Sequence, residues 1–272
     1  MLYFVATPIG NLADITFRAV ATLKKCDYIL CEDTRYSKRL LTAYEIDKPL
    51  KSYHKFNEQK RVDEIIEDLK AGKEIALISD AGTPGICDPG TRLALACIEH
   101  GLPFTSIPGP NAALTALVLS GLTTHRFQFL GFLPKKPKEI KSLFEELLHY
   151  PGTTIVYESP HRLVKTLLLL KTLDPGRKIA IARELTKLHE ECLRGTVEQL
   201  LPQLEKAAQK GEFVLLIEGK KEFEQQEWPE IPEHVEELQR EGLSKAEAIK
   251  KAAELRGVPK REIYNAIHKL SK

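Results

Sequence analysis

The chain has few cysteines, and their spacing excludes common metal and disulfide patterns. There are five cysteines in 272 residues, and no two of them are spaced C-x-x-C. The odd number and this spacing argue against a disulfide framework and against a zinc ribbon. The eight histidines are scattered along the chain, so the sequence indicates no metal site. We expect buried thiols in a reducing compartment.

Long apolar runs and a strong net charge are also missing. The longest apolar stretches are far too short to span a bilayer. The N-terminus lacks the basic region that precedes the apolar part of a signal peptide. The expectation is a cytoplasmic protein with no membrane partner. Because the formal net charge is only +2, any surface that binds nucleic acid must be local.

Several well-known motifs do not occur. The sequence contains no G-x-x-x-x-G-K-[ST], no G-x-G, no G-x-S-x-G and no H-E-x-x-H. These absences argue against a Walker phosphate loop, a dinucleotide-binding fingerprint, a hydrolase nucleophile elbow and a zinc protease helix. The missing G-x-G also removes the glycine signature of the commoner methyltransferase fold.

What the first half does contain is an alternation of short apolar segments with amphipathic ones. Residues 57–69 carry apolar side chains at helical spacing. Strands are expected at residues 2–7, 28–31, 50–53, 75–79 and 104–107. This alternation predicts an α/β fold with a mostly parallel sheet covered on both faces.

A charged, proline-bearing segment at residues 133–138 predicts a linker to a second α/β unit. In that unit strands are expected at 153–157, 178–183, 191–194 and 213–218, and helices at 160–172 and 196–209. Some antiparallel pairing is expected there. A second linker at 220–232 precedes short helices. The predicted division is an N-terminal α/β domain at 1–133, a second α/β domain at 134–221 and a helical segment at 222–272.

The last segment carries clear helix-end signals. Ser244 and Glu247 predict a capping box, Gly257 ends that helix and Pro259 opens the next. The pattern resembles a helix-turn-helix. Its basic residues are Arg256, Lys260, Arg261, Lys269 and Lys272. They indicate either RNA contact or a solvated helix face.

The residues after the fourth expected strand are the strongest functional signal. Residues 80–90 hold three glycines and two prolines, which allow close backbone approach and stiffen the path. Ligands of open parallel sheets bind beyond the carboxyl ends of the strands. Asp80 and Asp88 suit a cationic or hydroxyl-bearing ligand better than a phosphate. The alternative is a long structural turn.

Four sequence blocks together identify a family resemblance. They are ATPIGNLADIT at 6–16, CEDTR at 31–35, SDAGTPGICDPG at 79–90 and IPGPNA at 107–112, with weaker matches YESPHR at 157–162, ARELTK at 182–187 and RGT at 194–196. In this order they resemble the ribosomal RNA small-subunit cytidine 2′-O-methyltransferase family, a branch of the tetrapyrrole-methylase-like superfamily.

The resemblance implies an enzyme with two α/β domains of the tetrapyrrole methylase-like type and a small C-terminal helical segment. It implies S-adenosyl-L-methionine in the cleft between the domains, a homodimer, and 2′-O-methylation of a cytidine ribose in 16S ribosomal RNA of the small subunit. Cys87 and Asn111 stand where the family is expected to have serine. The implied donor-binding residues are Pro8, Asp80, Gly82, Thr83, Pro84, Ile86, Cys87, Asp88, Pro110, Ala112, Tyr157 and Leu185.

A ribose hydroxyl needs a base within hydrogen-bond reach as it attacks. The candidates are Glu32, Asp33, His54 and Glu158, although Asp33 is equally a cap for a helix starting near residue 34. We expect Glu32 and Arg35 to be the catalytic residues that flank the acceptor ribose, with Arg35 holding a phosphate bidentately. Helix capping or a surface salt bridge is the alternative for any of these carboxylates.

Local basic residues near the rim or the linker are the candidates for RNA contact. They are Lys38, Arg39, His54, Lys55, Lys60, Arg61, Lys135, Lys136 and Lys138. Two other functions stay open. One is a tetrapyrrole methyltransferase, whose first loop tends to be richer in glycine than residues 7–11 here; a diphthamide-pathway methylase is a further relative without specific support. The other is a non-catalytic nucleic-acid-binding protein led by the C-terminal helices.

Overall fold

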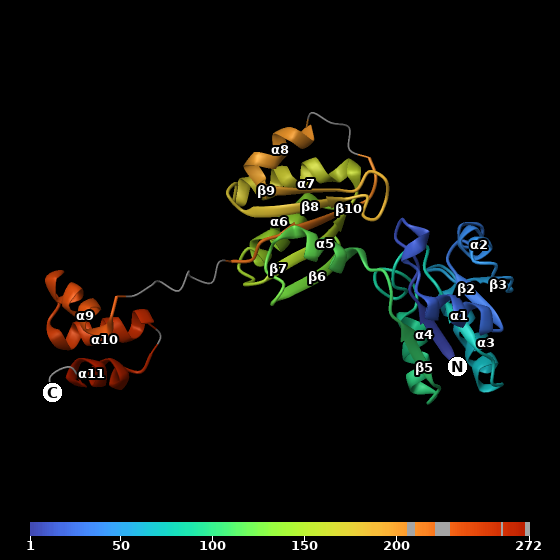
Figure 1. The fold of residues 1–272 in the computed structure, drawn as a ribbon, viewed down its shortest axis with the longest axis horizontal. Coiled ribbons are helices and arrows are strands. Elements are labelled where there is room, and N and C mark those ends of the chain that lie inside the picture. The colour runs from blue at the N-terminus through green and yellow to red at the C-terminus, as the bar shows by residue number, and fades with distance from the viewer. Residues whose placement is uncertain (206–209, 221–228, 257, 270–272) are drawn as a thin grey trace. The chain divides into compact units, whose positions relative to one another are not determined.

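The computed structural model describes residues 1–205, 210–220, 229–256 and 258–269 (Figure 1). Two compact units, Met1–Lys220 and Lys221–Lys272, divide the chain. The first unit holds two five-stranded sheets, and the second holds helices. Among the described residues, no helix has the length and apolar content needed to cross a membrane.

The first sheet is entirely parallel, in the order β3-β2-β4-β1-β5. Its strands are β1 (Leu2–Val5), β2 (Tyr28–Cys31), β3 (Leu50–Ser52), β4 (Ile75–Leu77) and β5 (Phe104–Ile107). Successive side chains point to opposite faces, so Leu30 and Ile29 lie in different apolar clusters. Both faces are therefore buried, as expected for a parallel sheet.

Helices cover both faces of this sheet (Figure 1). The helices α1 (Phe17–Lys25) and α2 (Thr34–Ala43) bury Ala19, Leu23 and Leu41 on one face. The helices α3 (Glu58–Lys70) and α4 (Thr91–Glu99) pack on the other. A short 3-10 helix, η1 (Leu12–Asp14), precedes α1. Because each helix returns the chain to the start of the next strand, the carboxyl ends of all strands meet at one rim.

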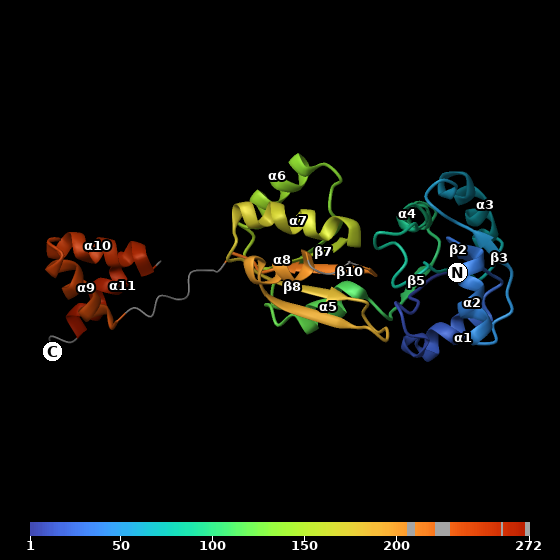
Figure 2. The same cartoon turned by 90° about the horizontal axis from the view of Figure 1, so that it is seen from above.

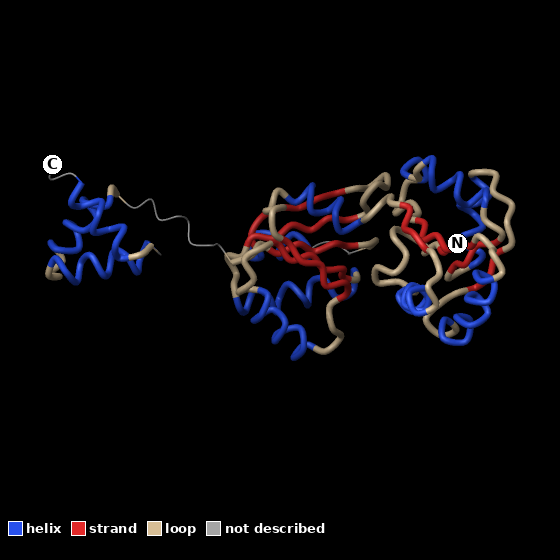
Figure 3. Tube along the Cα trace, turned by 90° about the horizontal axis from the view of Figure 1, so that it is seen from below, coloured by secondary structure: helices blue, strands red, loops and turns tan. Residues whose placement is uncertain are grey.

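The second sheet is mixed, in the order β6-β7-β10-β8-β9. Its strands are β6 (Phe127–Phe132), β7 (Thr153–Glu158), β8 (Lys178–Arg183), β9 (Glu191–Thr196) and β10 (Phe213–Ile217). The β6–β7 pair is parallel, and the other pairs are antiparallel. The tube in Figure 3 shows the strands of this sheet as one layer with helices on both sides.

One helix covers one face of the second sheet and three cover the other (Figure 2). The single helix is α5 (Ala112–Ser120), which buries Ala113, Ala116 and Leu117. The opposite face is covered by α6 (Pro137–Leu147), α7 (Pro160–Leu173) and α8 (Val197–Glu205). This face holds the larger apolar cluster, which includes the fully buried Phe144.

The C-terminal unit consists of α9 (Ile231–Arg240), α10 (Lys245–Arg256) and α11 (Lys260–Lys269). It has its own apolar cluster, centred on Ala248, Ala252 and Ile263. The predicted capping box is confirmed, because the Ser244 amide donates to Glu247 Oε2 at 3.0 Å and the Glu247 amide donates to Ser244 Oγ at 3.4 Å. The predicted helix end at Gly257 lies outside the described residues.

The predicted α/β class is confirmed, with one strand more than expected. The strand β6 was not predicted, and its pairing with β7 shifts register near Gly131, whose φ is +68°. Of the helix predicted at 196–209, residues 206–209 lie outside the described part. The division of the chain at residues 133 and 134 stays a prediction, although β6, which precedes it, already pairs in the second sheet.

Candidate functional site

The loop after β4 is tied to the end of β1. The Thr7 amide donates to the Gly82 carbonyl at 2.8 Å, and the Gly82 amide returns a bond to the Thr7 carbonyl at 3.0 Å. The buried Thr7 hydroxyl also donates to the Ser79 carbonyl at 3.2 Å. Ser79 in turn donates to the Ala81 carbonyl at 3.2 Å. These bonds hold residues 79–82 at the carboxyl rim of the first sheet.

The path of this loop depends on its glycines. The φ angles of Gly82, Gly85 and Gly90 are +81°, +83° and +142°, a region that side chains rarely tolerate. A Cβ at Gly90 would lie 2.9 Å from Phe4 Cε1. Cys87 also has a positive φ, +65°, without being glycine. Such strained non-glycine residues cluster at functional sites.

Beside this loop lies a cavity of about 410 Å³, within the size range of small-molecule sites. The loops of both sheets contribute to it. From the first sheet come Ile9, Asp80, Ala81, Gly82, Thr83, Ile86, Cys87, Asp88, Asn111 and Ala112. From the second come Phe132, Tyr157, Glu158, Ser159, Pro160, Leu185, Gly211, Glu212, Phe213 and Val214. The lining combines an apolar surface with a few carboxylates.

The start of α5 forms part of the wall. Asn111 caps this helix, because its Oδ1 accepts the Leu114 amide at 3.0 Å. Thr83 Oγ1 donates to the Pro110 carbonyl at 3.4 Å, which joins the loop after β4 to the turn before α5. Asn111 therefore has a clear structural role at a position where the family was expected to have serine.

A segment after β8 closes the cavity from the second sheet. Leu185 lies between two non-glycine residues of positive φ, Glu184 (+49°) and Thr186 (+64°). Lys187 Nζ pairs with Glu184 Oε1 and with Glu212 Oε2, both at 2.9 Å. These ion pairs hold the turn against the loop before β10.

Gly10 brings the first sheet close to this turn. A Cβ at Gly10 would lie 2.5 Å from Lys187 Cγ and 2.9 Å from the Leu185 carbonyl oxygen. The absence of a side chain thus allows the loop after β1 to contact the turn after β8. This close approach brings loops of both sheets together beside the cavity.

Aromatic rings form the second-sheet wall. The Tyr157 ring packs edge-on against Phe129 and Phe132, with centroids 4.9 and 5.4 Å apart. Burial raises the pKa of Tyr157 to about 12. Its hydroxyl is therefore protonated at neutral pH and presents a donor and a flat apolar face to the cavity.

Three carboxylates lie together at the rim, and each binds protons more readily than usual. Burial, together with the negative charges of Asp88 and Asp80, raises the pKa of Glu32 to about 7. Burial and Asp80 raise the pKa of Asp88 to about 6. Burial also raises the pKa of Asp80, which accepts the Asp33 amide at 3.4 Å. Such a cluster attracts cations and holds a carboxyl that titrates near neutral pH.

The structure brings most of the predicted donor-binding residues to this cavity. Those that line it are Asp80, Gly82, Thr83, Ile86, Cys87, Asp88, Ala112, Tyr157 and Leu185. Pro8, Pro84 and Pro110 are not among its lining residues, although each adjoins one that is. Their roles as donor-binding residues stay predictions.

The two predicted catalytic residues lie outside the cavity lining. Glu32 follows β2 and lies near Asp80 and Asp88. Arg35 lies in the first turn of α2 with its side chain 92% exposed, and its Nε is 3.7 Å from Asp33 Oδ1. Asp33 is the helix cap that the sequence allowed, since its Oδ1 accepts the Arg35 amide at 2.8 Å.

The other candidate bases have structural partners. Glu158 is fully buried and accepts the Ser159 amide at 2.8 Å and the Thr166 hydroxyl at 2.7 Å, with Arg162 Nε at 3.3 Å. This set of partners holds β7 to the start of α7 and gives Glu158 a structural role. His54 lies in the loop after β3, where its Nδ1 accepts the Phe56 amide at 3.2 Å.

The predicted basic residues lie mostly on exposed surfaces. Lys38 and Arg39 are exposed on α2, as are Lys55 and Lys60 near the start of α3 and Lys135, Lys136 and Lys138 near the start of α6. Arg61 pairs with Glu64 at 3.5 Å. In the C-terminal unit Lys260 and Arg261 are exposed, whereas Arg256 donates to His234 Nδ1 at 3.0 Å. The Lys269 side chain and Lys272 lie outside the described part.

Sequence reasoning missed several lining residues on the second sheet. Gly211, Glu212, Phe213 and Val214 line the cavity, but β10 reads as an ordinary buried strand. The glycine at position 211, whose φ is +98°, is the one feature of this segment that could have indicated a special backbone conformation before β10. Ser159 and Pro160 belong to the block at residues 157–162, which matches the family only weakly. Within the described ranges, no group of three His, Cys, Asp or Glu side chains converges as metal ligands do.

Comparison with known proteins identifies a matching family and close relatives of similar length. Residues 1–201 match the model of the family described as tetrapyrrole (corrin/porphyrin) methylases. A ribosomal RNA small subunit methyltransferase I of Halalkalibacterium halodurans is 48% identical, over 98% of this chain and 94% of its own length. The protein of that name from Bacillus subtilis is 47% identical, with the same two coverages.

Solved structures share the fold at low identity. A diphthine synthase aligns with a TM-score of 0.63 at 15% identity, over 80% of this chain and 89% of its own. A uroporphyrin-III-C-methyltransferase from Thermus thermophilus aligns with a TM-score of 0.56 at 21% identity, over 80% and 93%. At these identities the likeness concerns the fold alone. By its family model and its full-length relatives, the chain belongs to the tetrapyrrole methylase family and, within it, to the ribosomal RNA small subunit methyltransferase I group.

Proposed function

We propose that the protein transfers a methyl group from S-adenosyl-L-methionine to the 2′-hydroxyl of a cytidine ribose in 16S ribosomal RNA. The observation that carries the proposal is the cavity at the loop of residues 80–90, with a carboxylate cluster at its edge. The names of the full-length relatives support a ribosomal RNA substrate. The choice of cytidine and of the 2′-oxygen rests on the sequence resemblance.

The residues that line the cavity fit the proposed donor. Apolar side chains suit its adenine ring, and Asp80 and Asp88 suit its two cationic groups. Bound S-adenosyl-L-methionine supplies a methyl group on a positively charged sulfur. We assign donor contacts to Asp80, Gly82, Thr83, Ile86, Cys87, Asp88, Ala112, Tyr157 and Leu185, with Pro8, Pro84 and Pro110 shaping the loops beside them.

Glu32 is the proposed general base. A base works best when its pKa lies near the working pH, and the pKa of Glu32 is raised to about 7. Its place at the end of β2, beside the carboxylates of the cavity edge, puts it at the rim where the ribose would lie. The ionised form would accept the hydroxyl proton and share it with neighbouring carboxylates.

Arg35 is the proposed phosphate contact next to the acceptor ribose. Its side chain is 92% exposed, and the carboxylate that pairs with it among the described residues is the partly exposed Asp33, at 3.7 Å. An exposed pair of this kind holds the guanidinium weakly. The guanidinium is therefore able to turn toward a phosphate and bind it bidentately.

The proposal includes a homodimer in the cytoplasm, where ribosomal RNA would be its partner. The observation that favours a partner copy is an apolar strip on α5, where Leu114 is 49% and Val118 is 77% exposed one turn apart. Exposed apolar patches of this kind mark protein contacts. The proposed domains span residues 1–133, 134–221 and 222–272.

The test is to map methylated riboses in small-subunit RNA from cells with and without the gene. One 2′-O-methylcytidine should vanish without the gene and return with the wild-type gene, but not with Glu32→Ala. Calorimetry should show that Glu32→Ala still binds S-adenosyl-L-methionine. An unchanged methylation map would overturn the proposed substrate, and normal turnover by Glu32→Ala would remove Glu32 as the base.

A further inference from the structure

The loop that follows β3 presents an aromatic ring to solvent. Phe56 is 91% exposed, although large aromatic side chains normally bury most of their surface. Phe56 lies three residues after Tyr53, whose amide donates to the carbonyl of Cys31 at 2.8 Å. Cys31 is the last residue of β2, so this bond fixes the start of the loop at the rim. The exposed ring therefore lies on the same rim as Glu32 and the start of α2.

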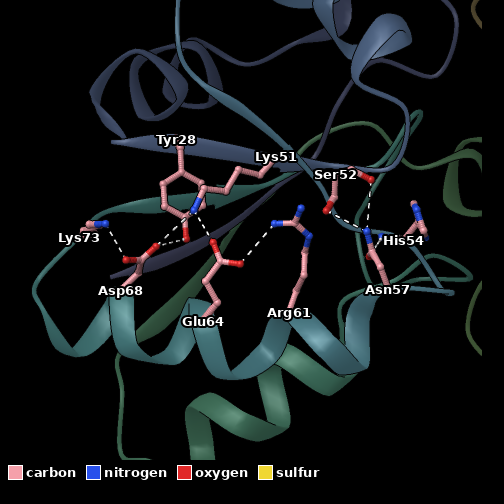
Figure 4. Close-up of polar contacts among 9 residues, drawn as sticks. All are labelled: Tyr28, Lys51, Ser52, His54, Asn57, Arg61, Glu64, Asp68 and Lys73. Atoms are coloured by element: carbon pink, nitrogen blue, oxygen red, sulfur yellow. Dashed lines mark hydrogen bonds and ion pairs between the residues drawn. The ribbon is translucent and has the colours of Figure 1, made fainter.

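The loop is held in one conformation by Asn57 (Figure 4). Its Oδ1 accepts the His54 amide at 2.8 Å, and its Nδ2 donates to the Ser52 carbonyl at 3.1 Å and to Ser52 Oγ at 3.3 Å. The Phe56 amide donates to His54 Nδ1 at 3.2 Å, and the two rings lie 6.0 Å apart at 66°. Little conformational freedom of the loop remains to be lost on binding.

The cations nearest to this ring divide into two groups. Lys51 and Arg61 are engaged by Glu64, at 2.7 and 3.5 Å (Figure 4). Lys55 and Lys60 are exposed, and no ion pair is found for either within the described ranges. Glu58, the acid next to the loop in the sequence, pairs with Arg92 at 3.2 Å.

The neighbouring helix α2 adds positive charge without any acid. Its residues Thr34–Ala43 include Arg35, Lys38 and Arg39, all exposed, and no Asp or Glu. The helix begins at the same rim, because it follows β2, the strand that pairs with β3. An exposed aromatic ring among cations is the combination that binds single-stranded nucleic acid, since bases stack on the ring and phosphates contact the cations. A purely apolar partner would not need these charges.

We propose that Phe56, supported by His54, is a stacking platform for an unpaired base of single-stranded RNA, with Lys55 and Lys60 contacting its phosphates. The proposal rests on the proposed function, since the platform would hold a nucleotide that flanks the acceptor ribose. It adds a binding site outside the cavity, for an unpaired nucleobase rather than for the methyl donor.

The test is the affinity of the full-length protein for a single-stranded RNA oligonucleotide from the methylated region, measured by fluorescence anisotropy at several salt concentrations. Phe56→Ala should weaken binding about 5- to 150-fold with an unchanged salt slope, as expected for one lost stacking contact. Phe56→Trp should restore binding. Lys55→Ala should lower the salt slope by about one.

Matched variants on two other helices of the first sheet, α4 and α1, serve as controls. Ile98→Ala removes an exposed apolar side chain and Lys24→Ala removes an exposed cation, and neither should change RNA affinity. A 2-aminopurine placed in the oligonucleotide should be quenched by the wild-type protein and by Phe56→Trp, but not by Phe56→Ala.

The outcomes separate this proposal from the proposed function. If the wild type methylates and binds RNA while Phe56→Ala does so equally well, the platform alone is wrong. If the wild type does not bind RNA, both proposals fail. If Phe56→Ala changes the sedimentation of the free protein instead of its RNA affinity, the ring is a contact between copies of the chain. In steady state Phe56→Ala should raise the KM for RNA and leave the KM for the donor unchanged.

Discussion

Glu32 stays protonated up to an unusually high pH, because burial and the charges of Asp88 and Asp80 disfavour its ionised form. The raised pKa values of Glu32 and Asp88, about 7 and about 6, compare with ordinary values of 4.5 and 3.8. Between the ordinary and the raised values, the folded protein holds protons that the unfolded chain has released. The free energy of unfolding contributed by these groups therefore falls as the pH rises from about 4 to about 7.

Replacing Glu32 by Gln should remove part of this pH dependence. Above about pH 7 the variant should be more stable than the wild type, because no buried negative charge forms beside Asp80 and Asp88. Below about pH 4.5 the two proteins should unfold alike, since the glutamate is then protonated in both states. Urea unfolding across this range is the measurement. The exposed Glu99→Gln is the control, and a constant offset at all pH values would contradict the assignment.

The charge of Asp88 should be visible in the activity profile. Among the neighbouring charges, that of Asp88 raises the pKa of Glu32 the most, so Asp88→Asn should lower that pKa. The acidic limb of kcat against pH should then move to lower pH, at saturating donor and RNA. Asp63→Asn, an exposed change on α3, should leave the limb in place. A profile that does not move would mean that another group titrates in that limb.

At the scale of the element, the loop after β4 depends on residues whose backbone only glycine adopts easily. Gly90 has a φ of +142°, and a Cβ there would lie 2.9 Å from Phe4 and 3.0 Å from Leu77. Phe4 and Leu77 belong to the core of the first sheet. The conformation of the loop and the packing of the core are therefore coupled at one position.

Gly90→Ala should destabilise the protein by at least about 2 kcal/mol, because backbone strain and overpacking add. Donor affinity should fall with it, since the loop would shift. The control is Gly72→Ala, where φ is +86° but a Cβ meets nothing within 4 Å. That variant carries backbone strain alone. Equal losses in thermal unfolding would show that the contact with Phe4 does not matter.

The strands show where sequence patterns suffice and where they fail. The five strands of the first sheet were predicted to within two residues, because each is short and followed by turn residues, and three of them are wholly apolar or nearly so. The strand β6 was missed, since FQFLGF is neither alternating nor buried throughout and contains Gly131. Its stability comes from pairing with β7, a contact that a local pattern does not contain.

At the scale of the whole molecule, the three C-terminal helices form a unit with an apolar cluster of its own. A protein ending at residue 220 should therefore keep its fold and its affinity for the methyl donor. If the exposed Lys260 and Arg261 contact RNA, its affinity for RNA and its salt slope should both fall. Calorimetry and anisotropy measure the three quantities. An unchanged salt slope would give these helices a structural role only.

The sequence by itself determined the fold class, the family and the loop of residues 80–90. The fold class follows from local periodicity, and the loop follows from glycines and prolines whose backbone requirements are readable one residue at a time. The family follows from the resemblance of four sequence blocks. The tertiary structure decided which residues share the cavity. It brought Gly211–Val214 beside the loop after β4, gave Glu158 structural partners and placed Glu32 among carboxylates. Burial and charge proximity depend on contacts between distant segments, and no local pattern encodes them.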